Sequence, residues 1–176
     1  MVESATPASF SHFAEEMTKR HHDLKSKAED RKVEFLVPPE NIRAVVASID
    51  ELIPDAFPES VFGVDLQNDK YELVYFFWSR TMQMLCELRV QLEGPAPSVE
   101  TVSDIFPGLE WHERETCEMF GINFTGHPDL RLLLLPDELE GKYPLRKSFQ
   151  TDRSRLNESG LTARAAAGQK DGGVSE

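Results

Sequence analysis

Residues 61–92 read VFGVDLQNDKYELVYFFWSRTMQMLCELRVQL, and this stretch decides the fold. Two runs rich in β-branched and aromatic residues, 61–66 and 71–78, flank the polar segment 67–70 and predict a hairpin. A further strand is predicted over 82–92, where apolar side chains alternate with mostly polar ones: Met84, Cys86, Leu88, Val90 and Leu92. Because alternate side chains of a strand point to opposite faces, we expect an antiparallel sheet with one covered face and one wet face.

Upstream of the hairpin, the pattern changes from strand to helix. Residues 33–37 alternate and predict a strand that ends at Pro38 and Pro39. Residues 42–53 carry apolar side chains at a spacing of three and four, which predicts an amphipathic helix: Ile42, Val45, Val46, Ile49, Leu52 and Ile53.

Residues 1–32 form a polar N-terminal segment with a possible helix. A weak apolar stripe at helical spacing would dock on the body or on a neighbour: Phe10, Phe13, Met17 and Leu24. The basic centre at 19–22 is more typical of a solvated helix than of a metal or phosphate site.

Downstream of the strands, residues 98–106 predict a second helix, with Ser98 as N-cap and Val99, Val102, Ile105 and Phe106 as its apolar side. The expected fold is therefore α+β, with a mostly antiparallel four-stranded sheet and helices on one face, in a single domain over 33–150. Residues 151–176 lack aromatic residues and predict an extended polar tail that is disordered or bound to a partner.

Composition narrows the class of protein. Of the net charge of −12, all lies in residues 33–150, which hold nine Lys or Arg against twenty-one Asp or Glu. This sign argues against a nucleic-acid binder. We see neither an apolar leader nor a window of about 20 apolar residues, so we expect a cytoplasmic chain.

The two cysteines, Cys86 and Cys117, form no CxxC pattern and are too few to ligate an iron–sulfur cluster or a structural zinc. Two reduced, packed thiols are the expectation, and a disulfide stays possible.

Residues 111–147 read WHERETCEMFGINFTGHPDLRLLLLPDELEGKYPLRK, and we call them the signature segment. Helical spacing predicts a short acidic helix that ends at Gly121, followed by an extended piece over 122–124. The four leucines 132–135 stop at Pro136, and such a run must be covered by the domain's own core or by a partner.

The motifs of this segment, in order, are Glu113-Arg114-Glu115, Glu118-Met119-Phe120-Gly121, Gly126-His127-Pro128, Leu130-Arg131 and Pro144-Leu145-Arg146-Lys147. The segment resembles the signature of the C-subunit family of respiratory complex I, the NADH-quinone oxidoreductase, with relatives in membrane-bound hydrogenases and deazaflavin-linked dehydrogenases. Ser148 stands where members often have Asp, and Leu139-Glu140 stands where Trp often precedes the glycine. These departures leave the branch of the family open.

The resemblance implies a non-catalytic structural subunit in the cytoplasmic arm of a membrane-bound redox complex. Its partners would be the large quinone-pocket or hydrogenase-like subunit and the iron–sulfur subunit, which it would position for electron transfer to quinone, and other arm subunits of the same complex. It would carry no cofactor, metal or catalytic residue of its own and would contact the membrane only through partner subunits. The donor and acceptor of the complex would be chosen by other subunits.

Three chemical readings compete with this one. Clustered carboxylates at Glu113, Glu115 and Glu118 could support acid–base catalysis, although we expect Arg114 to suppress any rise in their pKa. His112 with Glu115, Glu118 and His127 could bind a metal, but only one helix supplies these ligands. Cys117 as a nucleophile lacks a partner base. The alternative function is thus an independent soluble enzyme or metal-binding protein that uses the 113–118 acidic cluster.

We predict that a partner interface contains Glu113, Arg114, Glu115, Glu118, Phe120, His127, Arg131, Arg146 and Lys147. Charged groups around an apolar centre set the register of stable hetero-complexes. The charges could instead pair within the domain and hold the turn after the helix, with His127 satisfied by backbone. The two interpretations are not exclusive.

Overall fold

A computed structural model describes residues 7–150 of the chain. Seven strands and three α-helices, with three short 3₁₀ turns, follow in this order: α1 (Pro7–Arg20), β1 (Lys25–Glu29), β2 (Lys32–Val37), η1 (Pro39–Asn41), α2 (Ile42–Leu52), β3 (Ala56–Gln67), β4 (Lys70–Ser79), β5 (Met84–Glu93), β6 (Ser98–Glu100), η2 (Pro107–Leu109), α3 (Glu110–Phe120), β7 (Asn123–Thr125) and η3 (Asp137–Leu139).

The main sheet has five strands in the order β1-β2-β5-β4-β3. The meander β3-β4-β5 is antiparallel as predicted, whereas β2 runs parallel to β5 and β1 pairs antiparallel with β2. The expectation of a mostly antiparallel four-stranded sheet is therefore wrong, because the sheet is five-stranded and mixed. The parallel pair arises because α2 carries the chain across the sheet from β2 to β3, so that β5 returns beside β2.

Strand β1 escaped prediction because its sequence, KSKAE, has no apolar alternation and all five residues are exposed. Its backbone pairs with β2 from Lys25↔Leu36 to Glu29↔Lys32. The charged side chains of β1 suit an edge strand, because they discourage further pairing with another chain. Strand propensity predicts such an edge strand poorly, because the backbone pairing with β2 holds it in place.

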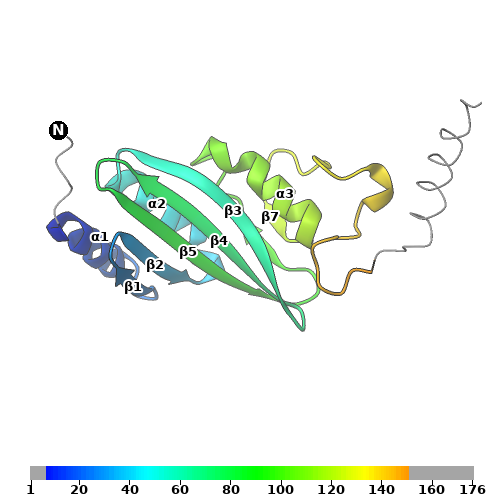
Figure 1. The fold of residues 1–176 in the computed structure, drawn as a ribbon, viewed down its shortest axis with the longest axis horizontal. Coiled ribbons are helices and arrows are strands. Elements are labelled where there is room, and N and C mark those ends of the chain that lie inside the picture. The colour runs from blue at the N-terminus through cyan, green and yellow to red at the C-terminus, as the bar shows by residue number, and fades with distance from the viewer. Residues whose placement is uncertain (1–6, 151–176) are drawn as a thin grey trace, which may run out of the picture.

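The three helices pack on one face of the sheet, and Figure 1 shows α2 behind the strands. Their apolar sides meet the inward residues of every long strand, among them Phe35, Leu73, Tyr75, Phe77 and Leu88, which are fully buried or nearly so. The prediction of helices on one face is confirmed. Each Å² of apolar surface removed from water stabilises the fold by about 25 cal/mol, so this layer is the main source of stability.

The N-terminal stripe docks on the body of the protein. Met17 is fully buried, and the ring of Phe13 meets that of Phe35 edge to face at 6.1 Å between centroids. The side chain of Phe10 lies outside the described residues. In the basic centre, Arg20 pairs with Glu51 at 2.7 Å and His21 bonds the Ser48 hydroxyl at 2.9 Å.

The helix predicted over 98–106 is wrong. Residues Ser98–Glu100 form β6, which pairs in parallel with β7, and a turn follows. Val99, Val102 and Phe106 are buried as expected, but from a strand and a turn. The apolar residues have a spacing of three, which is typical of a helix. Their strand partner, β7, lies about two dozen residues further along the chain, so the local sequence pattern does not reveal it.

The outward face of the sheet carries a charged ladder across β2, β5 and β4. Lys32 pairs with Glu87 at 2.5 Å, and Arg89 pairs with Glu72 at 2.7 Å and with Glu34 at 3.6 Å. Glu87 is almost completely buried by these long side chains. Beside the ladder, Phe62 of β3 packs on Phe76 of β4 with ring centroids 5.7 Å apart. This face is therefore only partly polar.

Helix α3 rests directly on strand β3 at Gly63. A Cβ at this position would lie 2.7 Å from the Phe120 ring, a distance at which something must shift. Gly63 is therefore needed for close approach of helix and strand.

We predict that Gly63→Ala lowers the free energy of unfolding by about 1–3 kcal/mol, as overpacking does. Denaturant unfolding of the purified chain measures this. Phe120→Leu in the Gly63→Ala background should recover part of the loss, because it removes the ring edge that clashes. Strict additivity of the two changes would contradict the proposed contact.

Candidate functional site

Helix α3 and the segments that follow it form the candidate site. The helix begins after the Pro107-Gly108 turn and ends at Gly121, which has the left-handed conformation with φ 70°. The Gly121 N–H donates to the Cys117 carbonyl at 2.8 Å. A Cβ at Gly121 would lie 2.6 Å from the Arg146 guanidinium and 2.7 Å from the Tyr143 ring. Both the helix end predicted here and its glycine are confirmed.

Glu113 points inward and is completely buried. Its carboxylate accepts the Thr101 hydroxyl and, at 2.9 Å, the Val102 N–H, so it ties α3 to the turn after β6. Burial raises the pKa of Glu113 above its ordinary value, and the two hydrogen bonds oppose this rise only in part.

The expectation that Arg114 would prevent a raised pKa among these carboxylates is wrong for Glu113. Arg114 turns to the other side of the helix, where it donates to the carbonyls of Arg131 and Leu132. Its guanidinium also lies 3.4 Å from the Asp129 carboxylate.

Glu118 holds the leucine loop, by which we mean residues 129–136. Its two carboxylate oxygens accept three consecutive backbone N–H groups, from Leu133 and Leu134 at 2.9 Å and from Leu135 at 3.4 Å. Arg114 binds carbonyls of the same loop. One acid and one base on α3 therefore satisfy both kinds of backbone group in a segment without regular structure.

His127 is a turn histidine, as predicted. Its Nδ1 accepts the Asp129 N–H at 3.0 Å, which leaves the proton on Nε2, and Nε2 donates to the Glu110 carbonyl at 3.0 Å. Asp129 also binds the Arg131 guanidinium at 2.8 Å, and the hydrogen bonds from Arg131 lower the pKa of the Asp129 carboxyl.

Arg146 and Lys147 fasten the end of the signature segment to α3 and to the sheet. The Arg146 Nε donates to the Phe120 carbonyl at 2.7 Å, and the guanidinium lies over the rings of Tyr143 and Tyr71. The Lys147 N–H donates to Asp65 at 2.7 Å. Although burial raises the pKa of Asp65, the backbone N–H bonds from Lys147 and Gln67 outweigh it and lower that pKa.

The structure thus supports internal roles for most of the predicted interface residues. Glu113, Arg114, Glu118, His127 and Arg146 all bond within the domain. Phe120 is buried, whereas Glu115 is partly exposed and Arg131 and Lys147 are exposed. Contact of the nine residues with a partner stays a prediction, because internal pairing and an interface can coexist.

Sequence reasoning missed the partners that these charges find inside the domain. They are Asp65, Tyr71, Thr101, Val102 and Tyr143. Thr101 lies twelve residues before Glu113, and Asp65 lies 82 residues before Lys147. A single sequence carries no local signal for contacts over such separations.

The surface of the signature segment is rich in exposed apolar side chains. Three large apolar side chains are mostly exposed: Trp111 at 67%, Leu134 at 60% and Leu145 at 55%. Leu132, Leu133 and Leu135 are partly covered. The domain therefore covers the leucine run only in part.

Within residues 7–150, no group of three or more His, Cys, Asp or Glu side chains has the geometry to hold a metal ion. The Glu118 oxygens that the metal hypothesis required accept backbone N–H groups instead. Cys86 is a buried free thiol, Cys117 is a partly covered one, and burial raises the pKa of both. None of the helices in the described part of the chain has the length and apolar character to span a membrane.

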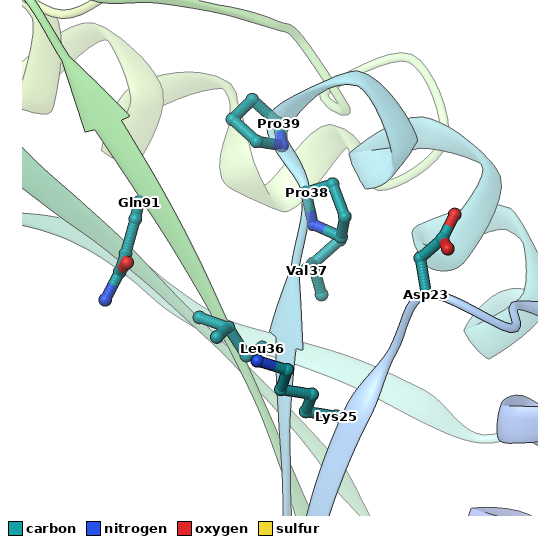
Figure 2. Close-up of a pocket in the computed structure, with 7 residues that line it drawn as sticks. All are labelled: Asp23, Lys25, Leu36, Val37, Pro38, Pro39 and Gln91. Atoms are coloured by element: carbon teal, nitrogen blue, oxygen red, sulfur yellow. The ribbon is translucent and has the colours of Figure 1, made fainter.

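A pocket of about 270 Å³ lies at the end of β2 (Figure 2). Val37, Pro38, Pro39 and Gln91 line it, with Asp23 from the segment before β1 and Lys25 from the start of β1. None of its lining residues belongs to the signature segment, and a single carboxylate with a single ammonium group offers no recognisable catalytic set.

We predict that Glu118→Ala speeds hydrogen exchange of the Leu133, Leu134 and Leu135 amides at least about tenfold, because a charged acceptor is worth about 1.5–3 kcal/mol. Exchange detected by mass spectrometry on the purified chain measures this. Glu115→Ala, one turn earlier on the same helix, is the matched control and should leave these amides unchanged. Equal protection in both variants would show that Glu118 does not hold the loop.

The raised pKa of Glu113 predicts a pH dependence of stability. Below the ordinary pKa of a carboxyl group both the folded and the unfolded states are protonated at this residue. As pH rises from that value through the raised pKa, the folded state retains the proton longer, so its stability falls. The unfolding free energy of the wild type minus that of Glu113→Gln should therefore decrease with pH across this window and then level off. Urea titrations at several pH values test this, and Glu138→Gln, at an exposed position, should show no such trend.

The comparisons with known proteins agree with this geometry. The family model described as the respiratory-chain NADH dehydrogenase 30 kDa subunit matches residues 35–155. The C subunit of the F420H2 dehydrogenase of Methanosarcina mazei is 40% identical over 92 residues, which are 52% of this chain and 58% of that protein. The C subunit of the NADH-quinone oxidoreductase of Roseiflexus sp. is 43% identical over 93 residues, 52% of this chain and 53% of that one. The aligned region thus spans about half the length of these curated relatives.

Two solved structures share the fold. A chain in the structure of the membrane-bound sulfane sulfur reductase, an archaeal respiratory membrane complex, superimposes with a TM-score of 0.72 over 95% of this chain and 96% of that one, at 21% identity. A trypsin-resistant fragment of Nqo5 superimposes with a TM-score of 0.60 over 69% of this chain and 99% of the fragment, at 22% identity. Because the family model covers well over half of the chain, including the whole signature segment, the protein belongs to the family of the respiratory-chain NADH dehydrogenase 30 kDa subunit, the C subunit of NADH-quinone oxidoreductases.

Proposed function

We propose that the chain is a non-catalytic structural subunit of a membrane-bound redox complex of the complex I family. It would bind the large quinone-pocket or hydrogenase-like subunit and the iron–sulfur subunit, and hold them in position for electron transfer to quinone. It would lie on the cytoplasmic side of the membrane, which it would contact only through these partners.

The proposal rests on a difference between the charged and the apolar side chains of the signature segment. Its charged side chains bind backbone groups and fix the leucine loop, while Trp111, Leu134 and Leu145 stay largely exposed. A soluble monomer gains nothing from fixing large apolar side chains in water, whereas an interface gains a preorganised apolar surface. The family of subunits to which the chain belongs supports the same interpretation.

The internal bonds also weigh against the alternative of an independent enzyme or metal-binding protein. Of the three carboxylates that this alternative uses, Glu113 and Glu118 accept backbone N–H groups from neighbouring segments, which leaves Glu115 alone at the surface. A raised pKa at Glu113 follows from its burial, and a completely buried side chain does not reach a substrate without opening the fold. We therefore assign Glu113 a structural role.

Leu134→Asp provides the test. Because this side chain is 60% exposed, the charge should leave the thermal unfolding of the purified chain nearly unchanged. Burial of the same charge at an interface costs several kcal/mol, so recovery of the assembled complex from detergent-solubilised native membranes should fall at least about tenfold. Activity per assembled complex should be retained.

Leu66→Asp is the matched control, because it adds the same charge at an exposed leucine outside the signature segment. It should assemble like the wild type. Full assembly of Leu134→Asp with lost turnover would contradict a structural role, and purification of the tagged wild type as a lone monomer would move the assignment to the enzyme alternative.

A further inference from the structure

A groove opens between strand β3 and helix α3. Strand β3 is the last strand of the sheet, so one of its edges has no partner strand among the described residues. Ser60, Val61, Phe62 and Gly63 of this strand form one wall, and His112, Glu115, Thr116, Met119 and Phe120 of α3 form the other, with Leu145 at the rim. We call this site the β3–α3 groove.

The groove is apolar and large enough for one side chain. Its volume is about 200 Å³, and apolar cavities of about 150 Å³ already accept a benzene ring. Phe62 at the groove is 43% exposed and Leu145 is 55% exposed, so large apolar side chains of the groove face water. Trp111, which is 67% exposed, stands one helical turn before Glu115.

The polar groups of the groove give it a negative sign. Arg114, the only Lys or Arg of α3, points to the leucine loop, and Glu113 and Glu118 are bound elsewhere in the domain. Glu115 is the acid on the groove wall, and within residues 7–150 it forms no ion pair. The Thr116 hydroxyl on one wall donates to the Val61 carbonyl on the other at 3.5 Å, and both residues are buried. Glu115 is therefore the acceptor that a partner bearing a cation would meet.

We propose that the β3–α3 groove binds a segment of a neighbouring subunit that inserts one aromatic or branched aliphatic side chain and places a Lys or Arg against Glu115. The inserted side chain packs among Phe62, Met119 and Leu145, and the cation lies at the Glu115 end of the groove. This inference rests on the proposed function for the nature of the occupant, a subunit of the same complex. It adds Phe62, Met119 and Leu145 to the interface and gives Glu115 a specific role.

Site-specific photocrosslinking in the native complex tests the occupant. Phe62 is replaced by p-benzoylphenylalanine in the tagged full-length chain, the complex is irradiated in native membranes, and the crosslinked peptides are identified by mass spectrometry. We expect a peptide of another subunit whose crosslinked residue lies within two positions of a Lys or Arg. A crosslink within this chain, to its own residues 151–176 for example, or the absence of any crosslink, would overturn the proposal.

Two groove variants supply an independent readout. Glu115→Lys reverses the sign of the groove and Ser60→Trp fills it, and each should lower recovery of the assembled complex at least about tenfold. Glu40→Lys makes the same charge reversal at an exposed site outside the groove and the signature segment and should assemble normally. Thermal unfolding of each purified chain shows whether a variant fails to fold. Should Ser60→Trp prove unstable, Ser60→Leu fills less of the groove and replaces it.

The outcomes separate this proposal from the proposed function. If the wild-type chain recovers its complex while both stable groove variants assemble fully, the groove is not the docking site and the structural role stands. If the wild-type chain recovers no other subunit, the structural role fails and the groove proposal fails with it.

Discussion

The carboxylate of Glu118 binds three consecutive backbone N–H groups, and the arrangement of the leucine loop depends on this contact. Residues 129–136 have no helix or strand to satisfy their backbone, and desolvated amides without acceptors would cost about 1–3 kcal/mol each. An ionised acceptor on a rigid helix removes this cost for three of them at once. The loop can then hold its leucines in one conformation, and the apolar surface of the segment has a defined shape.

Helix α3 distributes such contacts in four directions. Phe120 and Gly63 bring it against the sheet, Glu113 reaches the turn after β6, and Glu118 holds the leucine loop. At its end, Gly121 allows Arg146 to reach the Phe120 carbonyl. These bonds join segments that are far apart in the sequence, so α3 connects the sheet, the turn after β6, the leucine loop and the end of the signature segment. Two of its four acids, Glu113 and Glu118, accept backbone N–H groups.

Local pattern predicted the parts of the fold whose cause is local. The amphipathic spacing of α2, the alternation of β5 and the C-cap at Gly121 each depend on a few neighbouring residues, and the structure has all three. Strand β1 and the β6–β7 pair depend on partners elsewhere in the chain, and there the prediction missed one and misassigned the other. For the site, sequence alone identified which residues matter but not where they point. Arg114 and Glu113 are neighbours in sequence, and helical geometry points them about 100° apart. Which segment each of them meets is decided by the fold.

The distribution of charge bears on how such a subunit recognises its neighbours. Glu113 is completely buried and Arg146 holds the Phe120 carbonyl, so these two groups act mainly on the shape of the surface. In the proposed assembly, recognition would rest on the apolar side chains that these charges position, and acids such as Glu115 would select the sign of the partner. Affinity from apolar burial with selectivity from a small number of charges is the usual arrangement of stable interfaces. A mutation of a signature charge would therefore weaken assembly indirectly, through loss of a fixed surface, whereas a mutation at the groove would weaken it directly.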